Sequence, residues 1–118
     1  MTDAYRRISA DTALDLLETL GTGSGKAVLF DIRDPGSFGA GHHPAALPLS
    51  DANLPGYLAS LDRSTTLLVC CYHGNSSQGA ARFLADQGFA AACSIDGGWD
   101  DLAEALSRRS PSTEDDAA

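Results

Sequence analysis

The most constraining feature of this sequence is an apolar run that ends on a cysteine and leads through a short polar turn into a helical pattern. The run is Leu67-Leu68-Val69-Cys70, and the turn is Cys71-Tyr72-His73-Gly74-Asn75-Ser76-Ser77. A strand, turn and helix in this order place the Cys71 thiol beside backbone N–H groups and the positive end of a helix dipole. Such a site favours the thiolate, which is the nucleophilic form of cysteine. Gly74 permits turn conformations in which successive amides point inward.

Strand-like and helix-like segments alternate along the rest of the chain. The sequence predicts a short extended segment at residues 5–8, later strands at 27–32, 46–49, 66–70 and 91–95, and a turn at 35–38. It predicts helices at 10–20, from Leu54 to Leu61, from the Cys71 turn to Gln87, and at 99–106. This alternation is typical of an α/β domain with a largely parallel sheet of about five strands and helices on both faces. The ligand site of such a sheet lies beyond the carboxyl ends of the strands, where Cys71 is expected.

Helix ends and buried faces follow from local patterns. We expect Ser9 to cap the first helix, Ser50 or Asp51 the second, and Ser76 or Ser77 the third. The apolar spacing predicts that the first two helices bury Ala13, Leu16, Leu17, Leu20, Leu54, Tyr57, Leu58 and Leu61. One domain over residues 5–107 is expected, followed by an acidic, disordered tail at 110–118.

The charge of the chain excludes several classes of partner. Its 118 residues carry a formal net charge of −8, with eight Lys and Arg and no basic cluster, which argues against nucleic acids and membrane surfaces. No apolar run approaches the roughly 20 residues that span a bilayer, and the first residues do not resemble a signal peptide. Three cysteines form no disulfide framework. A soluble protein of the reducing cytoplasm is the expectation.

The other candidate residues each have a structural interpretation. Cys70 and Cys93 are expected in the core, whereas His73 is either a solvated loop residue or a group that tunes the thiolate. Asp31 and Arg33 fall on one side of a strand end and are expected to form an ion pair that braces the loops. Ser76 and Ser77 are expected as capping residues and extra donors, and Trp99 as a packing residue. The adjacent residues His42 and His43 look like a pair of metal ligands. Adjacent histidines diverge in extended chain and have no second ligand pair, so no metal site is expected.

Several motifs together resemble the rhodanese (thiosulfate sulfurtransferase) homology domain. They are Asp31-Ile32-Arg33-Asp34, Phe38, Gly41-His42-x-Pro44, the Cys71 turn, and Ser94-Ile95-Asp96-Gly97-Gly98-Trp99. The match over roughly residues 5–107 is most similar to bacterial single-domain sulfurtransferases of the glycerol-operon type. The resemblance implies that Cys71 takes the outer sulfur of thiosulfate as a persulfide and passes it to cyanide or a thiol acceptor such as thioredoxin. It further implies that the backbone N–H groups of residues 72–76 hold the persulfide, and that no cofactor is required.

Two alternative functions were compared with this interpretation. Phosphatases of the dual-specificity type and arsenate reductases use a C-x5-R loop, but the sixth residue after Cys71 is Ser77, which cannot neutralise a phosphoryl group. A non-catalytic binding module is the other alternative, because a fold does not establish a function. The retained cysteine and complete turn favour the enzyme.

The chain departs from the family pattern in a few places. His43 and Ala45 stand where an aliphatic residue and a glycine are usual, Leu102 replaces a frequent aromatic residue, and Gln78 replaces a lysine of the nearest relatives. The missing charge at Gln78 predicts weaker binding of the thiosulfate dianion, since the protein is already strongly negative.

Overall fold

Five parallel strands form one sheet in the order β1-β5-β4-β2-β3. The computed structural model describes residues 5–109. The strands are β1 (Tyr5–Ile8), β2 (Ala27–Asp31), β3 (Ala46–Pro48), β4 (Thr66–Cys70) and β5 (Ala91–Ile95). This confirms the predicted α/β fold with a parallel sheet of about five strands. Because β4 lies at the centre between β5 and β2, the residue that follows it is flanked by loops from both neighbours.

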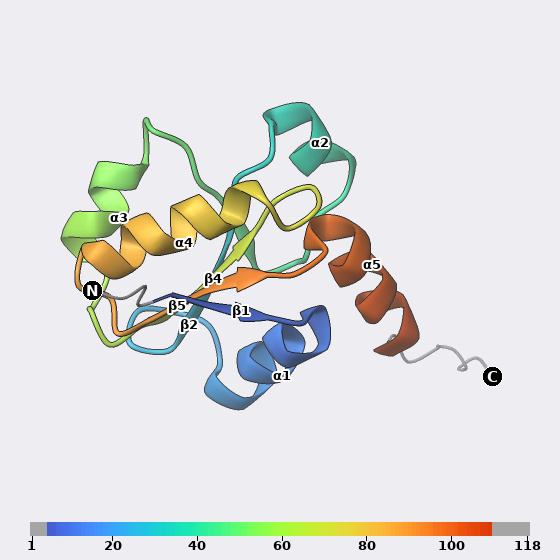
Figure 1. Cartoon of the computed structure of the whole chain (residues 1–118), viewed down its shortest axis with the longest axis horizontal. Helices are drawn as coiled ribbons and strands as arrows, with labels where there is room; N and C mark the ends of the chain where they lie inside the picture. Colours follow the sequence, from blue (N-terminus) through green and yellow to red (C-terminus); the bar gives the residue numbers. More distant parts are fainter. Residues whose placement is uncertain (1–4, 110–118) are drawn as a thin grey trace.

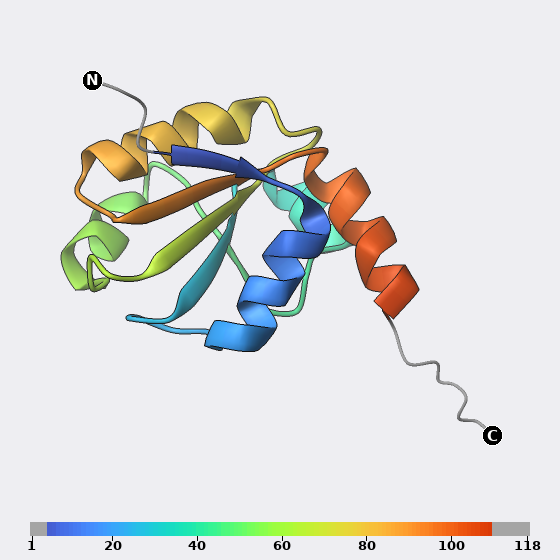
Figure 2. The ribbon, with the colours of Figure 1, turned by 60° about the horizontal axis from the view of Figure 1, so that its bottom comes forward.

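Helices cover both faces of the sheet, as Figures 1 and 2 show. The helices are α1 (Ala10–Leu20), α2 (Pro35–Ala40), α3 (Leu54–Ser60), α4 (Ser76–Asp86) and α5 (Gly98–Arg109). Figure 2 shows α4 above the strands and α1 below them. One apolar cluster lies between the sheet and helices α1 and α5, and the other between the sheet and helices α3 and α4.

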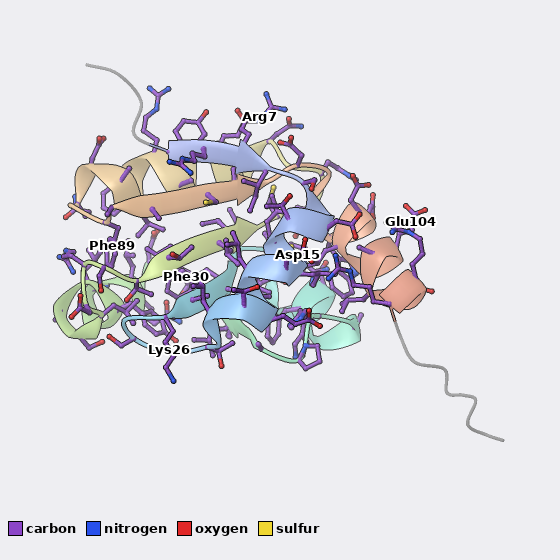
Figure 3. The ribbon with its side chains drawn as sticks, turned by 90° about the horizontal axis from the view of Figure 1, so that it is seen from below. Arg7, Asp15, Lys26, Phe30, Phe89 and Glu104 are labelled. Atoms are coloured by element: carbon purple, nitrogen blue, oxygen red, sulfur yellow. The ribbon has the colours of Figure 1, made fainter. Side chains whose placement is uncertain are left out.

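The central strand alternates its side chains between these two clusters. Leu68 and Cys70 of β4 belong to the cluster under α1 and α5, whereas Leu67 and Val69 belong to the cluster under α3 and α4. Successive residues of a strand point to opposite faces, so both faces of β4 are buried. In Figure 3, Phe30 lies among these packed side chains, while charged residues such as Glu104 lie outside.

The first helix agrees with its prediction except on part of its buried face. Ser9 caps α1, and its hydroxyl accepts a hydrogen bond from the backbone N–H of Thr12. Leu17 and Ala13 are buried as expected, but Leu14 is also buried and Leu20 is exposed, so the prediction for Leu20 was wrong. Leu20 is the last residue of the helix and is followed by the C-cap Gly21.

The other helices required three corrections. Residues 35–38 belong to the short helix α2 rather than a turn, because the Asp34 carboxylate accepts from the Ser37 N–H and Pro35 occupies the first helical position. Helix α3 is capped by Asn53, not by Ser50 or Asp51. Helix α4 is capped by Asn75, not by Ser76 or Ser77, and no side-chain capping bond forms there. The expected inward residues of α3 are packed against the core beside α4; they are Leu54, Tyr57, Leu58 and Leu61.

The C-terminal helix is longer than the sequence predicted. Helix α5 begins at Gly98, one residue before the predicted start at Trp99, and extends beyond the predicted end at residue 106 to Arg109. The predicted tail at residues 110–118 lies outside the described part of the chain. None of the helices within residues 5–109 is long and apolar enough to cross a membrane.

Candidate active site

The sulfur of Cys71 lies at the centre of the loop that joins β4 to α4. The backbone N–H groups of Gly74 and Ser77 donate to Cys71 Sγ at 3.1 and 3.3 Å. In the thiol form, Cys71 also donates to the Ser77 hydroxyl, with 3.2 Å between Sγ and Oγ. Only 2% of the Cys71 surface is exposed, so a reacting molecule must enter the loop to reach the sulfur. The loop therefore forms a set of donors that converge on one atom.

These hydrogen bonds control the ionisation of the thiol. Burial on its own raises the pKa of Cys71, but the side chain and backbone of Ser77 and the backbone of Gly74 and His73 lower it more, so the net shift is downward. Cys70 shows the opposite result: burial, with the carboxylate of Asp31 nearby, raises its pKa to about 12. Burial also raises the pKa of Cys93. Of three buried cysteines, Cys71 alone has a stabilised thiolate, and the other two are core residues as predicted.

A second buried hydroxyl lies behind Ser77. The Oγ atoms of Ser77 and Ser94 are 2.8 Å apart, and both residues are fully buried. Ser94 comes from β5, the strand beside β4, and stands opposite Val69 in the sheet register. No role was predicted for Ser94 on its own, although a serine within the otherwise apolar segment Ala91–Ile95 was the available signal.

The Cys71 loop packs tightly against the turn that begins α5. The N–H of Trp99 donates to the Cys71 carbonyl at 2.7 Å. A Cβ atom at Gly74 would lie 2.7 Å from Gly97 N, and one at Gly98 would lie 2.4 Å from the Cys71 carbonyl oxygen. Both glycines also have positive φ, at 94° and 59°. Glycine is required where the two turns meet, because a side chain there would displace the backbone that holds the sulfur.

Asp31 and Arg33 form the ion pair that the sequence predicted, at the carboxyl end of β2. Arg33 and Asp31 are both buried, and Arg33 Nη2 lies 2.8 Å from Asp31 Oδ2. Arg33 also donates to the Gly41 carbonyl at 2.7 Å and stacks 4.9 Å from the centre of the Trp99 ring. The pair thus links the ends of β2, α2 and α5 and does not contact the sulfur. Trp99 packs against the core, in agreement with its prediction.

The other loop residues point away from Cys71 Sγ. Tyr72 is exposed and its hydroxyl accepts from the Asp34 N–H at 3.0 Å. His73 is exposed, with Nδ1 3.1 Å from a carboxylate oxygen of Asp100. Asn75 and Ser76 are exposed at the start of α4. Residues 72–76 were expected to supply amides to the sulfur. Within this range the Gly74 N–H donates to Cys71 Sγ, and the His73 backbone helps to lower the pKa of Cys71. The second N–H that donates to the sulfur belongs to Ser77, just outside the expected range.

The departures from the family pattern have ordinary structural roles. Gln78 Nε2 donates to the Gly74 carbonyl at 2.9 Å, and Gln78 Oε1 accepts from the Tyr5 hydroxyl at 3.2 Å. Leu102 is buried in the core. The ring nitrogen Nδ1 of His43 accepts from the Ala45 N–H at 2.9 Å. His42 Nδ1 lies 2.7 Å from the Phe38 carbonyl oxygen, so the two histidine rings make separate local contacts.

A sequence model of the rhodanese-like domain family matches residues 10–105. This chain belongs to the rhodanese-like domain family. The match covers the Cys71 loop, the turn before α5 and every strand except β1. The resemblance seen in the motifs is therefore confirmed at the level of the domain.

Solved structures show the same fold. A rhodanese-like domain protein from Staphylococcus aureus has a TM-score of 0.66 at 20% identity, with 82% of this chain and 90% of that chain covered. A rhodanese-related protein from Thermoplasma volcanium has a TM-score of 0.67 at 24% identity, with 85% and 92% covered. A Rhodopseudomonas palustris protein of unknown function, described as a possible tyrosine phosphatase, has a TM-score of 0.68 at 21% identity, with 86% and 82% covered. At these identities the likeness concerns the fold.

Proposed function

We propose that this rhodanese-like domain is a thiosulfate sulfurtransferase that carries sulfane sulfur as a persulfide on Cys71. The observation that carries the proposal is the convergence of the Gly74 N–H, the Ser77 N–H and the Ser77 hydroxyl on Cys71 Sγ. Donors aimed at one atom stabilise negative charge there without rearrangement. They suit a thiolate before the reaction and a persulfide anion after it.

The reaction would proceed by double displacement. The Cys71 thiolate attacks the outer sulfur of thiosulfate, a new S–S bond forms, and the S–S bond of thiosulfate breaks as sulfite leaves with the electron pair. An acceptor thiolate or cyanide then attacks the outer sulfur of the persulfide and releases the Cys71 thiolate. Each step exchanges one sulfur–sulfur bond for another bond to sulfur, so the protein's own groups need only hold negative charge. A protein thiol such as thioredoxin is one acceptor of the required class.

The same geometry argues against phosphoryl transfer. A phosphatase loop of the C-x5-R type needs a guanidinium at the position of Ser77. Here the Ser77 side chain is fully buried and faces Cys71 Sγ and Ser94 Oγ. Arg33 is committed to Asp31 and to the Gly41 carbonyl. A phosphate dianion would therefore lack the bidentate cationic partner on which such enzymes rely.

Intact-mass measurement tests the proposal directly. The reduced protein is incubated with thiosulfate, desalted and weighed, then treated with cyanide and weighed again. We expect a gain of one sulfur atom that cyanide removes. Cys71→Ser should gain none, whereas the core variant Cys70→Ser should still gain one, because Cys70 stays protonated.

Steady-state kinetics provide the second half of the test. Double displacement predicts parallel double-reciprocal lines for thiosulfate and cyanide. A protein that gains no sulfur from any sulfane donor would overturn the proposal and favour a non-catalytic binding module. Hydrolysis of an aryl phosphate that depends on Cys71 would favour a phosphatase instead.

A further inference from the structure

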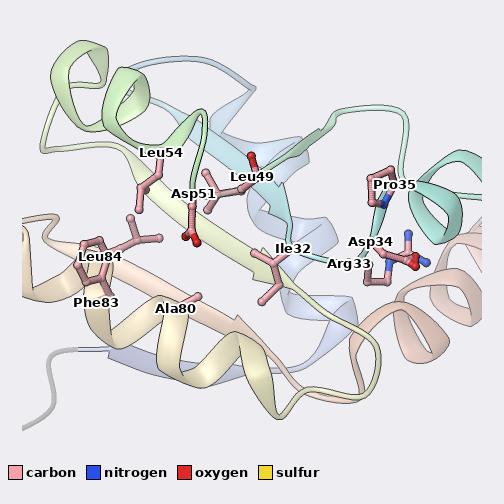
Figure 4. Close-up of a pocket in the computed structure, with 11 residues that line it drawn as sticks. Ile32, Arg33, Asp34, Pro35, Leu49, Asp51, Leu54, Ala80, Phe83 and Leu84 are labelled. Carbon is pink, nitrogen blue, oxygen red and sulfur yellow. The ribbon is translucent and has the colours of Figure 1, made fainter.

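An open apolar groove lies between α3 and α4, beside the Cys71 loop (Figure 4). Its volume is about 730 Å³. Apolar side chains from β2, from the segment after β3, from α3 and from α4 form most of its surface; they are Ile32, Leu49, Leu54, Ala80, Phe83 and Leu84. Phe83 is 42% exposed, which is unusual for a phenylalanine on a helix packed against a sheet. The groove thus leaves apolar surface in contact with solvent.

The groove is continuous with the candidate active site. At one end, the Ile32 N–H donates to the carbonyl of Cys70, the residue before the candidate nucleophile, at 2.9 Å. Asp34 also borders the groove, and its N–H donates to the hydroxyl of Tyr72 in the loop. One wall belongs to α4, which begins in the loop. A molecule that occupies the groove would therefore have its end beside the mouth of the loop.

A carboxylate points into this apolar surface. Figure 4 shows the Asp51 side chain between Leu54 and Ile32, directed toward the α4 wall. Within residues 5–109, Asp51 has no ion pair or side-chain hydrogen bond. The second carboxylate at the rim, Asp34, has its pKa lowered mainly by hydrogen bonds from Ser37, so it is ionised at neutral pH. The neighbouring guanidinium of Arg33 is neutralised by Asp31. Apolar walls beside the unpaired carboxylate of Asp51 suit a ligand with an aliphatic stem and a cationic end.

We propose that this groove binds a lysine or arginine side chain of a polypeptide thiol acceptor, and so directs the acceptor cysteine to Cys71. The inference rests on the proposed sulfur transfer. Lys and Arg pack their methylene stems on apolar surface while their charged ends remain at polar partners. Here the stem would lie along Leu54 and Phe83 and the charge would meet Asp51. An arginine would also gain from lying over the exposed ring of Phe83.

The other possible occupants match the charge less well. Residues 110–118 contain three acidic and no basic side chains, and residues 1–4 contain one acidic side chain. A second copy of the chain brings a net charge of −8, and nucleic acids bring phosphates. A small anionic thiol would be repelled by Asp51 and Asp34. Charge complementarity therefore favours a basic polypeptide segment.

The binding step is tested without any sulfur chemistry. Capped peptides that are identical except for lysine, norleucine or glutamate, each with serine in place of the acceptor cysteine, are titrated into isotopically labelled protein and followed by NMR. We expect the lysine peptide to bind most tightly and to shift resonances of Phe83 and Leu54. Asp51→Asn should weaken lysine-peptide binding by about three- to fivefold, the scale of an exposed ion pair. Glu104→Gln, which removes an equal charge on the outer side of α5, should leave it unchanged.

The transfer step uses cysteine versions of the same peptides and the protein preloaded with thiosulfate. Transfer to the lysine peptide should slow by a similar factor in Asp51→Asn, whereas loading by thiosulfate should not slow. Asp51→Lys should reverse the preference, so that the glutamate peptide becomes the better acceptor. This exchange of charges is a gain of function, which a general loss of stability cannot mimic.

The outcomes separate the two proposals. Equal effects of Asp51→Asn and Glu104→Gln, or resonance shifts outside the groove, would overturn the inference. Self-association that Asp51→Lys alters would assign the groove to a second copy and overturn it as well. Peptide binding at the groove without any sulfur loading would overturn the proposed function and the acceptor role together. Loading that succeeds while every peptide fails to bind would overturn the groove inference alone.

Discussion

The hydroxyl groups of Ser77 and Ser94 meet at 2.8 Å directly behind the sulfur of Cys71. A hydroxyl has a single proton to donate. Ser77 can therefore donate to the Cys71 thiolate only when Ser94 is the donor within the serine pair. Ionisation of Cys71 fixes the direction of both hydroxyl groups, and Ser94 becomes a positioning residue that acts through Ser77.

Removal of this second hydroxyl should shift the pH dependence of sulfur loading. In Ser94→Ala, the Ser77 hydroxyl loses its partner, so the thiolate is less stabilised and the pKa of Cys71 rises. Because the thiolate is the reactive form, the rising part of the rate profile moves to higher pH. We expect loading at neutral pH to fall a few-fold and to recover in alkaline buffer. Stopped-flow measurement of the first turnover from pH 5 to 10 checks this.

Ser77→Ala is the matched comparison for that experiment. It removes the hydroxyl at Cys71 Sγ itself and should slow loading at neutral pH by about tenfold, the usual scale of a hydrogen bond to a charged group. The double variant Ser77→Ala/Ser94→Ala should be no slower than Ser77→Ala, because Ser94 acts through Ser77. Additive effects of the two substitutions would contradict the positioning role.

The three thiols should differ in their reaction with iodoacetamide. The pKa of Cys71 is lowered by its hydrogen bonds, whereas burial raises those of Cys70 and Cys93. Alkylation of the native protein should therefore begin at lower pH than for a free thiol and modify Cys71 alone. Peptide mapping after brief labelling at several pH values provides the measurement. Early labelling of Cys70 would show that the pKa values of Cys70 and Cys71 do not differ in the direction that the structure indicates.

The close contact at Gly74 predicts a large effect of one added methyl group. In Gly74→Ala, a Cβ would lie 2.7 Å from Gly97 N at a φ of 94°, and relief of this contact must move the loop or the adjacent turn. We expect a loss of about 1–3 kcal/mol of stability from backbone strain and loss of sulfur loading. Gly79→Ala is the control, since its Cβ meets nothing within 4 Å inside α4. It should raise stability by about 0.5–1 kcal/mol in denaturant titrations.

Breaking the buried ion pair should cost much stability, and a second substitution should recover part of it. Arg33→Met would leave the carboxylate of Asp31 buried without its cation, at a cost of about 3–5 kcal/mol. The double variant Asp31→Asn/Arg33→Met should recover part of this loss, because the uncompensated charge is gone. Urea titrations of both variants give the values. Arg7→Met, which breaks an exposed pair with Asp96, should cause a much smaller change.

The sequence predicted the parts of this molecule that depend on local pattern. The strand that ends at Cys70 and the glycine at Gly74 were sufficient to place the Cys71 thiol at the carboxyl edge of a parallel sheet. The Asp31–Arg33 pair was predictable because alternation along a strand puts both side chains on one side. These features need no knowledge of distant contacts.

Contacts between distant segments were not predictable in the same way. Ser77 was expected to cap α4, but its hydroxyl faces Cys71 and Ser94 because the helix begins one residue earlier than Ser77, with Asn75 as the cap. Leu20 has the right spacing for the buried face of α1, yet it is the last residue of the helix and is exposed. Asp51 lines the groove together with residues just after β2 and residues of α4 that lie far from it in the sequence.

Gln78 connects a sequence departure to the loop and allows a test of donor binding. It supports the Gly74 carbonyl through Nε2 and contacts the Tyr5 hydroxyl, but it contributes no charge near the sulfur. Gln78→Lys should lower the KM for thiosulfate by a few-fold at low ionic strength, because an added cation attracts the dianion. The gain should shrink in high salt, since screening weakens this attraction.

Gln78→Met separates charge from hydrogen bonding in this test. It removes both hydrogen bonds of Gln78 without adding a cation, so its KM should not fall at any ionic strength. If Gln78→Lys leaves the KM unchanged or raises it, the hydrogen bonds of Gln78 to Gly74 and Tyr5 matter more than charge, and the proposed weakness of thiosulfate binding is wrong. If Gln78→Met lowers the KM as well, the added charge is not the cause, because both variants lose the hydrogen bond that Gln78 accepts from the Tyr5 hydroxyl.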